Sequence, residues 1–197
     1  IEEQGEEYGR IDIGKGKRVM VEFVSANPTG PMHMGNARGG ALGDCLASVL
    51  EYAGYEVTRE FYINDAGNQI EKFGKSLSAR YIQQLKGEDA IEFPEDGYQG
   101  GDITDHAKAF IEIHGDKYLN TSEEERRQAL IDYALEKNIK ALKADLEKYR
   151  IYYDVWFRES KLHKEGHVKA AIDRLTEAGY TYEDEGALWL NLSPIHI

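Results

Sequence analysis

Hydrophobic positions in the first 85 residues switch between spacings typical of strands and of helices. Residues 18–24 form an apolar run without alternation, which is typical of a strand buried on both faces of a parallel sheet. From about Gly35 apolar residues recur at helical spacing, and Gly54 supplies a C-terminal stop. A second strand over 55–63 and a second helix over 68–85 follow. This order predicts an α/β fold with a Rossmann-like parallel sheet and flanking helices.

The pattern after residue 85 is mainly helical. Residues 86–101 are rich in Gly, Pro and acidic side chains and predict a loop, and residues 102–114 predict a short helix. Ser122 and Glu125 form a capping box that opens a long helix. Its apolar positions are expected to pack on the core: Ile131, Leu135, Leu142, Leu146 and Tyr149. The remainder predicts a strand over 152–157, a helix over 163–178 and a hairpin over 180–190.

Composition narrows the class of protein. The chain has 197 residues and a formal net charge of -12, which disfavours a stand-alone nucleic-acid clamp but not a nucleic-acid partner held by a local patch. The single cysteine, Cys45, excludes an internal disulfide and a zinc site built from several cysteines, and its apolar neighbours predict a buried position. No apolar run is long enough to span a membrane and no signal-peptide pattern opens the chain, so we expect a cytoplasmic protein without a membrane partner.

The segment 24–36 lies between the first predicted strand and helix, where open parallel sheets bind ligands. A helix start there offers unpaired N–H groups suited to phosphate. Gly30 and Gly35 leave room for a nucleotide against the backbone, and His33 and Asn36 place two hydrogen-bond donors on one turn. His33 alone would be a simple helix cap, but the whole ordered segment predicts a phosphate site.

Two further segments are candidates for the same sheet edge. Glu22 interrupts the apolar strand, and a buried carboxylate there needs a cationic ligand such as a guanidinium, unless the strand end is solvated or Glu22 pairs with Arg59. Asp65 and Gln69 follow the second strand and either line the pocket or form an ordinary turn with helix capping. The sequence leaves both pairs of alternatives open.

Residues 21–36 and 64–69 resemble the catalytic domain of arginyl-tRNA synthetases, and residues 97–100 and 157–160 look like further segments of that family. The resemblance covers roughly residues 5–190 and implies a class I synthetase. Such an enzyme activates arginine with Mg²⁺-bound ATP to arginyl-adenylate and transfers the arginyl group to tRNA. The second histidine of the family's His-x-Gly-His element is replaced by Asn36, whose amide can still donate a hydrogen bond.

The resemblance also implies residue roles. His33 and Asn36 would serve catalysis. ATP would be bound by Pro28, Thr29, Gly30, Pro31, His33, Gly35 and Asn36. Arginine would be held by Glu22, Ser25, Ala26, Asn27, Asp65 and Gln69. No residue is expected to bind a resident metal ion.

By the same resemblance the catalytic domain is incomplete. We expect residues 1–85 to form the first part of a Rossmann-like domain with the phosphate motif and 86–150 to form a mainly helical insertion. Residues 151–178 would return to the catalytic domain, and 179–197 would start a second insertion and end in a non-native tail from residue 191. We therefore expect a truncated part of the ligase, with most tRNA contacts made by domains outside this chain.

Other functions fit some of these features. A small nucleotidyltransferase with a His-x-Gly-His-type site matches the chain length better, and a non-catalytic nucleotide-binding module matches an incomplete site. Glu22, Asn27 and the 64–69 segment favour the synthetase over both. His163 and His167 have the spacing of one helix face, but their neighbours lack the metalloprotease pattern and indicate a solvated face.

Overall fold

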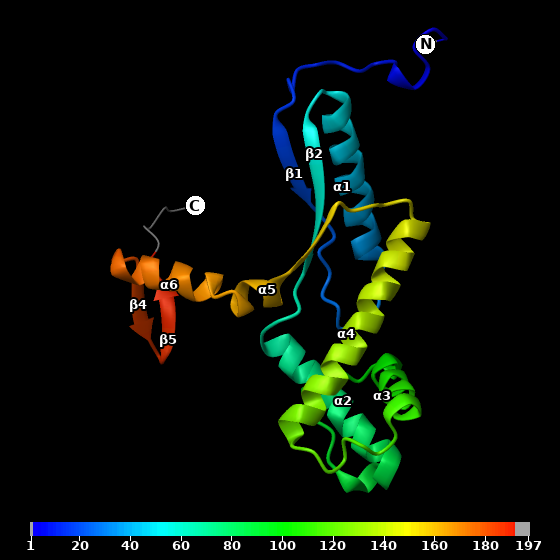
Figure 1. Ribbon diagram of the computed structural model, residues 1–197, viewed down its shortest axis with the longest axis vertical. Helices are drawn as coiled ribbons and strands as arrows, with labels where there is room; N and C mark the ends of the chain where they lie inside the picture. The colour runs from blue at the N-terminus through cyan, green and yellow to red at the C-terminus, as the bar shows by residue number, and fades with distance from the viewer. Residues whose placement is uncertain (1, 192–197) are drawn as a thin grey trace. The chain divides into compact units, whose positions relative to one another are not determined.

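The computed structural model describes residues 2–191, and the chain divides into two compact units, Ile1–Phe157 and Arg158–Ile197. The first unit carries the predicted alternation of strands and helices (Figure 1). Its elements are η1 (Gly5–Glu7), β1 (Arg18–Glu22), α1 (Met34–Tyr52), β2 (Glu56–Ile63), α2 (Asn68–Lys86), η2 (Glu88–Ala90), α3 (Gly101–His114), α4 (Glu123–Lys148) and β3 (Val155–Arg158). β1 and β2 are parallel and the strand order is β1-β2-β3, which confirms the α/β fold class.

β1 differs from the expected doubly buried strand. Its side chains alternate between exposed and half-buried positions, and Met20 is 57% exposed. Glu22 is exposed as well. One face of β1 is therefore uncovered within the described chain, and the expectation of a strand buried on both faces is wrong.

Helix α1 contacts the sheet through small residues. Gly40, Gly43 and Ala47 are its buried positions, and a Cβ atom added to Gly43 would overlap the ring of Phe23. The glycines thus let the helix backbone approach the sheet closely. The larger apolar residues in the middle of the helix point outward: Leu42, Cys45, Leu46 and Val49. The prediction of a buried Cys45 is therefore wrong.

Arg59 ties α1 to β2. Its Nη2 donates to Glu51 Oε2 at 3.0 Å and its Nε lies 3.4 Å from Asp44 Oδ1, both on α1. The hydrogen bond from Arg59 lowers the pKa of the Glu51 carboxyl. Arg59 is thus committed to α1, and the alternative in which it pairs with Glu22 is wrong.

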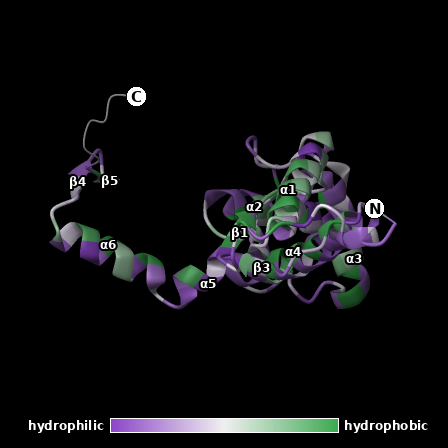
Figure 2. Cartoon of the chain, turned by 90° about the horizontal axis from the view of Figure 1, so that it is seen from above, coloured by the Kyte–Doolittle hydropathy of each residue, from purple (hydrophilic) through white to green (hydrophobic). Residues whose placement is uncertain are grey.

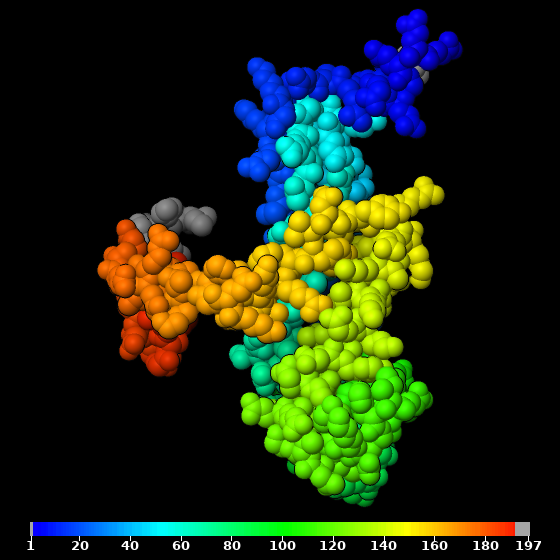
Figure 3. All heavy atoms as spheres, in the orientation of Figure 1, coloured from blue at the N-terminus to red at the C-terminus, as the bar shows by residue number. Residues whose placement is uncertain are grey.

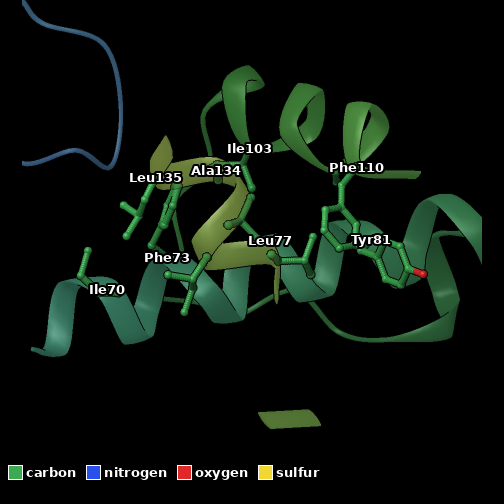
Figure 4. Packing of buried hydrophobic residues seen from close by; sticks show 11 residues of the cluster. Ile70, Phe73, Leu77, Tyr81, Ile103, Phe110, Ala134 and Leu135 are labelled. Carbon is green, nitrogen blue, oxygen red and sulfur yellow. The ribbon is translucent and has the colours of Figure 1, made fainter. Parts of the chain in front are cut away.

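The larger hydrophobic core lies among the helices α2, α3 and α4. Figure 4 shows Phe73, Leu77 and Tyr81 of α2 packed toward Ile103 and Phe110 of α3. In the space-filling view α3 and the start of α4, drawn in green, form one closely filled lobe (Figure 3). This core holds the three helices together.

Helix α4 begins where predicted, with the Ser122 half of the capping box among the described contacts, and packs as predicted except at its end. The hydroxyl of Ser122 accepts a hydrogen bond from the Glu125 N–H at 3.1 Å, as expected of a capping residue. The expected apolar positions are buried up to Leu146, whereas Tyr149 is 51% exposed. Tyr149 is the C-cap, where the chain leaves the helix, and its predicted burial is wrong.

The second unit contains α5 (Glu159–Lys164), α6 (His167–Glu177) and a hairpin of β4 (Thr181–Asp184) and β5 (Ala187–Leu190). The hairpin confirms its prediction, but the single helix expected over 163–178 is wrong. Gly166 adopts a left-handed conformation with φ 76° and separates α5 from α6, so His163 and His167 lie on different helices. Hydrophilic and hydrophobic residues mix along α6 (Figure 2). The predicted tail residues 192–197 lie outside the described part.

The helices of the described residues include none that is long and apolar enough to cross a membrane.

Tyr153 packs against the sheet-side core and hydrogen-bonds to the chain just after β1. Its hydroxyl donates to the Phe23 carbonyl at 3.0 Å, and burial raises its pKa well above the ordinary value of 10. A raised pKa contributes stability below about pH 10, and this is lost as pH rises toward the folded pKa because the unfolded chain ionises first. Tyr153→Phe should lower the free energy of unfolding by about 1 kcal/mol at pH 7. This difference in stability between the unsubstituted chain and the variant should narrow between about pH 9 and 11.

Denaturant unfolding at a series of pH values measures this gap. Tyr152→Phe is the matched control because Tyr152 is 64% exposed. A gap for Tyr153→Phe that stays constant with pH would contradict the proposed ionisation.

Candidate functional site

The loop after β1 contains two adjacent residues in an unusual backbone conformation. Val24 and Ser25 have φ values of 66° and 44°, in the left-handed region that residues other than glycine rarely adopt, β-branched valine least of all. Strain of this kind is typical of functional sites, where the surrounding structure over-determines the backbone. The turn is held by the Ser25 N–H, which donates to the Phe23 carbonyl at 3.0 Å.

Ser25 joins the ends of the two neighbouring strands. Its hydroxyl donates to Glu22 Oε1 at 2.7 Å and accepts from the Tyr62 N–H of β2 at 3.1 Å. Glu22 is exposed, so the argument from an unpaired buried carboxylate does not hold. The solvated strand end was the correct alternative, although the Ser25 bond orients the carboxylate at this edge.

The predicted segments after β1 and β2 meet in space. The Asn27 side-chain amide donates to Gln69 Oε1 at 2.6 Å, which joins the first loop to the first turn of α2. Asp65 is 9% exposed at the end of β2. The N-cap of α2 is Gly67, which has no side chain, and both alternatives for Asp65 and Gln69 stay predictions.

His33 and Asn36 cap the start of α1 reciprocally. His33 Nδ1 accepts from the Gly35 N–H at 3.1 Å, and Asn36 Oδ1 accepts from the His33 N–H at 3.0 Å. The acceptor role of Nδ1 places the hydrogen of a neutral ring on Nε2. Both side chains therefore cap the helix and still offer a donor each, His33 Nε2 and Asn36 Nδ2, at a helix N-terminus.

A pocket of about 500 Å³ lies against this loop. It is lined by Val24, Ser25, Ala26, Asn27, Thr29, Gly30, Pro31, His33, Asn36, Tyr98, Gly100 and Asp102. Most residues predicted for the site share this wall. Five others lie outside the lining: Glu22, Pro28, Gly35, Asp65 and Gln69.

Three lining residues had no role in the sequence prediction. Tyr98, Gly100 and Asp102 come from the loop before α3 and its first turn. A Cβ on Gly30 would lie 3.7 Å from Asp102 Oδ2, so this segment closely approaches the loop between β1 and α1. The Gly-rich run at 97–101 was a signal for close backbone approach, but only the fold shows which segment it approaches.

Comparisons with known proteins agree with this geometry. Residues 3–195 match the model of "tRNA synthetases class I (R), catalytic domain". The chain is 68% identical to an arginine–tRNA ligase of Ruminiclostridium cellulolyticum over 99% of its length and 64% identical to one of Acetivibrio thermocellus. A crystal structure assigned to the arginyl-tRNA synthetases, from Campylobacter jejuni, superposes with a TM-score of 0.78 at 34% identity over 95% of this chain and 40% of that one.

The match to these relatives is partial in length. The chain spans 35% of the length of both the R. cellulolyticum and the A. thermocellus proteins. The parallel sheet and the family match agree with one another, and the chain belongs to the class I arginyl-tRNA synthetase family, matching its catalytic domain.

Proposed function

We propose that this chain supplies the ATP- and arginine-binding part of an arginine–tRNA ligase. The observation that carries the proposal is the pocket in which the β1–α1 loop, the His33–Asn36 turn and the segment around Tyr98 meet. The Asn27–Gln69 bond joins the end of β2 to the same loop. Residues of these types at one sheet edge suit a nucleotide and a small polar substrate.

The proposed reaction has two steps. In the first, the carboxylate of arginine attacks the α-phosphate of ATP, an arginyl-adenylate forms and pyrophosphate leaves. In the second, the arginyl group passes to the terminal ribose of tRNA and AMP leaves. His33 Nε2 and Asn36 Nδ2 would donate to phosphate oxygens, where negative charge increases during the first step. Asn36 would donate at any ordinary pH because its amide does not titrate.

The residues present fit a nucleotide better than a resident metal. A Cβ on Gly30 would meet only Asp102 Oδ2, at 3.7 Å, so the turn is open there, whereas the ring of His33 fills the space beside Gly35. The described residues contain no cluster of three or more His, Cys, Asp or Glu side chains that could hold a metal ion. We infer that Mg²⁺ arrives bound to the phosphates of ATP, as is common in phosphoryl-transfer sites. Asp102 is the carboxylate in the pocket lining.

We also propose the wider setting of the chain. Residues 86–150 would form a helical insertion between the parts of a Rossmann-like domain, and most contacts with tRNA would come from parts of the longer ligase. The net charge of -12 supports this division, because an acidic chain as a whole repels the phosphate backbone of a polynucleotide. A cytoplasmic location is proposed with it.

Glu22 would recognise the guanidinium of arginine. Its carboxylate is oriented by Ser25 and exposed at the sheet edge, so a bidentate pair can form there. Glu22→Gln should weaken binding of a non-hydrolysable arginyl-adenylate analogue about tenfold at low salt, and added salt should reduce this difference because the pair is exposed.

Calorimetric titration of the 197-residue chain tests the proposal, with a glutamyl-adenylate analogue as the competing ligand. Glu56→Gln is the matched control, since Glu56 lies at the opposite end of the parallel pair. Equal affinity for the two analogues would favour a nucleotidyltransferase-like site that reads only the adenylate. Binding with no pyrophosphate exchange would favour a nucleotide-binding module, and no binding would contradict the proposal for this chain.

A further inference from the structure

The buried side chain of Asn138 connects the helical segment to the phosphate loop. Asn138 lies on α4 and is 9% exposed. Its Nδ2 donates to the carbonyl of Pro28 at 2.8 Å, and its Oδ1 lies 2.8 Å from Nε2 of His106 on α3. One amide thus joins α3, α4 and the loop that follows β1.

The chemistry of Pro28 and His106 determines which atom donates in each of these two hydrogen bonds. A proline carbonyl can only accept, so the Asn138 nitrogen must face Pro28 and its oxygen must face His106. His106 must then carry a hydrogen on Nε2 and donate to that oxygen. Protonation of the ring keeps this hydrogen, so His106 holds the orientation of Asn138 in either charge state.

The anchored carbonyl lies where it can control the pocket. Pro28 is fully buried and Thr29 is 8% exposed, and the chain continues from them into Gly30 and Pro31 of the pocket wall. Loss of the donor would leave the Pro28 carbonyl buried without a hydrogen-bond partner, which is unfavourable. The loop can escape this cost by moving, and its movement would displace His33.

We propose that Asn138 is a positioning residue of the synthetase site and that His106 orients it. Neither residue lines the 500 Å³ pocket; they fix the Pro28 carbonyl and thereby the turn that presents His33 and Asn36. This inference rests on the proposed function for its effect on ligand affinity, but not for its effect on the loop.

The test uses Asn138→Leu, which keeps the size of the side chain and removes both hydrogen bonds. Amide NMR signals of Gly30, Gly35 and Asn36 should shift in the ligand-free chain, and affinity for the arginyl-adenylate analogue should fall about tenfold. Gln128→Met is the matched control, because Gln128 is an exposed amide on the same helix bonded only to Asp132 in the described contacts.

A second pair of variants covers the case in which Asn138→Leu fails to fold. His106→Gln keeps a side-chain N–H near Asn138, so the amide NMR signals of the loop should stay in place and the affinity for the analogue should be retained. In His106→Leu the same signals should shift and the affinity should fall. Unchanged loop signals in His106→Leu would overturn the inference. If the unsubstituted chain binds no analogue, the proposed function fails, and the loop signals still decide the inference.

Discussion

Gly43→Ala should lower the free energy of unfolding by about 2 kcal/mol or more, although alanine favours helices. The added methyl would occupy the space of the Phe23 ring, and α1 would have to move away from β1. Phe23 belongs to the core formed with Phe61 and Ile151, so the movement would loosen the sheet side of the first unit. Denaturant unfolding monitored by circular dichroism measures the change.

Gly39→Ala provides a control of opposite sign on the same helix. A Cβ there would have no neighbour within 4 Å, so alanine should raise stability by about 0.5–1 kcal/mol through its helix propensity. Equal effects of the two substitutions would contradict the close approach of α1 to Phe23.

His33→Ser should weaken binding of the arginyl-adenylate analogue about 10- to 100-fold while the fold stays intact. Serine is a good N-cap and can accept from the backbone as His33 Nδ1 does, so the start of α1 should persist. It cannot place a donor where Nε2 lies, and a hydrogen bond to a charged phosphate is worth about 1.5–3 kcal/mol. Calorimetric titration and thermal unfolding of the same samples separate the two roles.

Met34→Ser is the comparison for this variant, because Met34 is the next residue and is 77% exposed. It should leave the affinity nearly unchanged. A similar loss of affinity in both variants would mean that disturbance of the turn, and not the missing donor, explains the result.

Patterns of neighbouring residues predicted most of the helices and strands. The wrong predictions concern which side chains are buried, and this depends on how the elements pack. The strand, Gly-Pro turn and capped helix of residues 18–52 are encoded in neighbouring residues, and they form as expected. The exposure of Leu42, Cys45 and Leu46 was not predictable, because an apolar helix pattern does not state which stripe meets the sheet. Gly43 decides this through its close approach to Phe23.

In the candidate site, too, contiguous residues could be predicted from the sequence, whereas residues brought together by packing could not. The segment 24–36 could be identified from sequence, since its residues are contiguous and occur in the strand–helix context that phosphate binding needs. The burial of Glu22 was wrongly inferred from its apolar neighbours, which alternate in exposure along β1. Asp102 and Asn138 are far from the loop in sequence, and only the packing of α3 and α4 brings them to it.

A crystal structure of the 197-residue chain with the arginyl-adenylate analogue tests the central claim most directly. The account predicts phosphate oxygens within hydrogen-bond distance of His33 Nε2 and Asn36 Nδ2, and the guanidinium against the carboxylate of Glu22. An analogue seated instead in the apolar pocket lined by Met32, Leu146 and Tyr149 would contradict it.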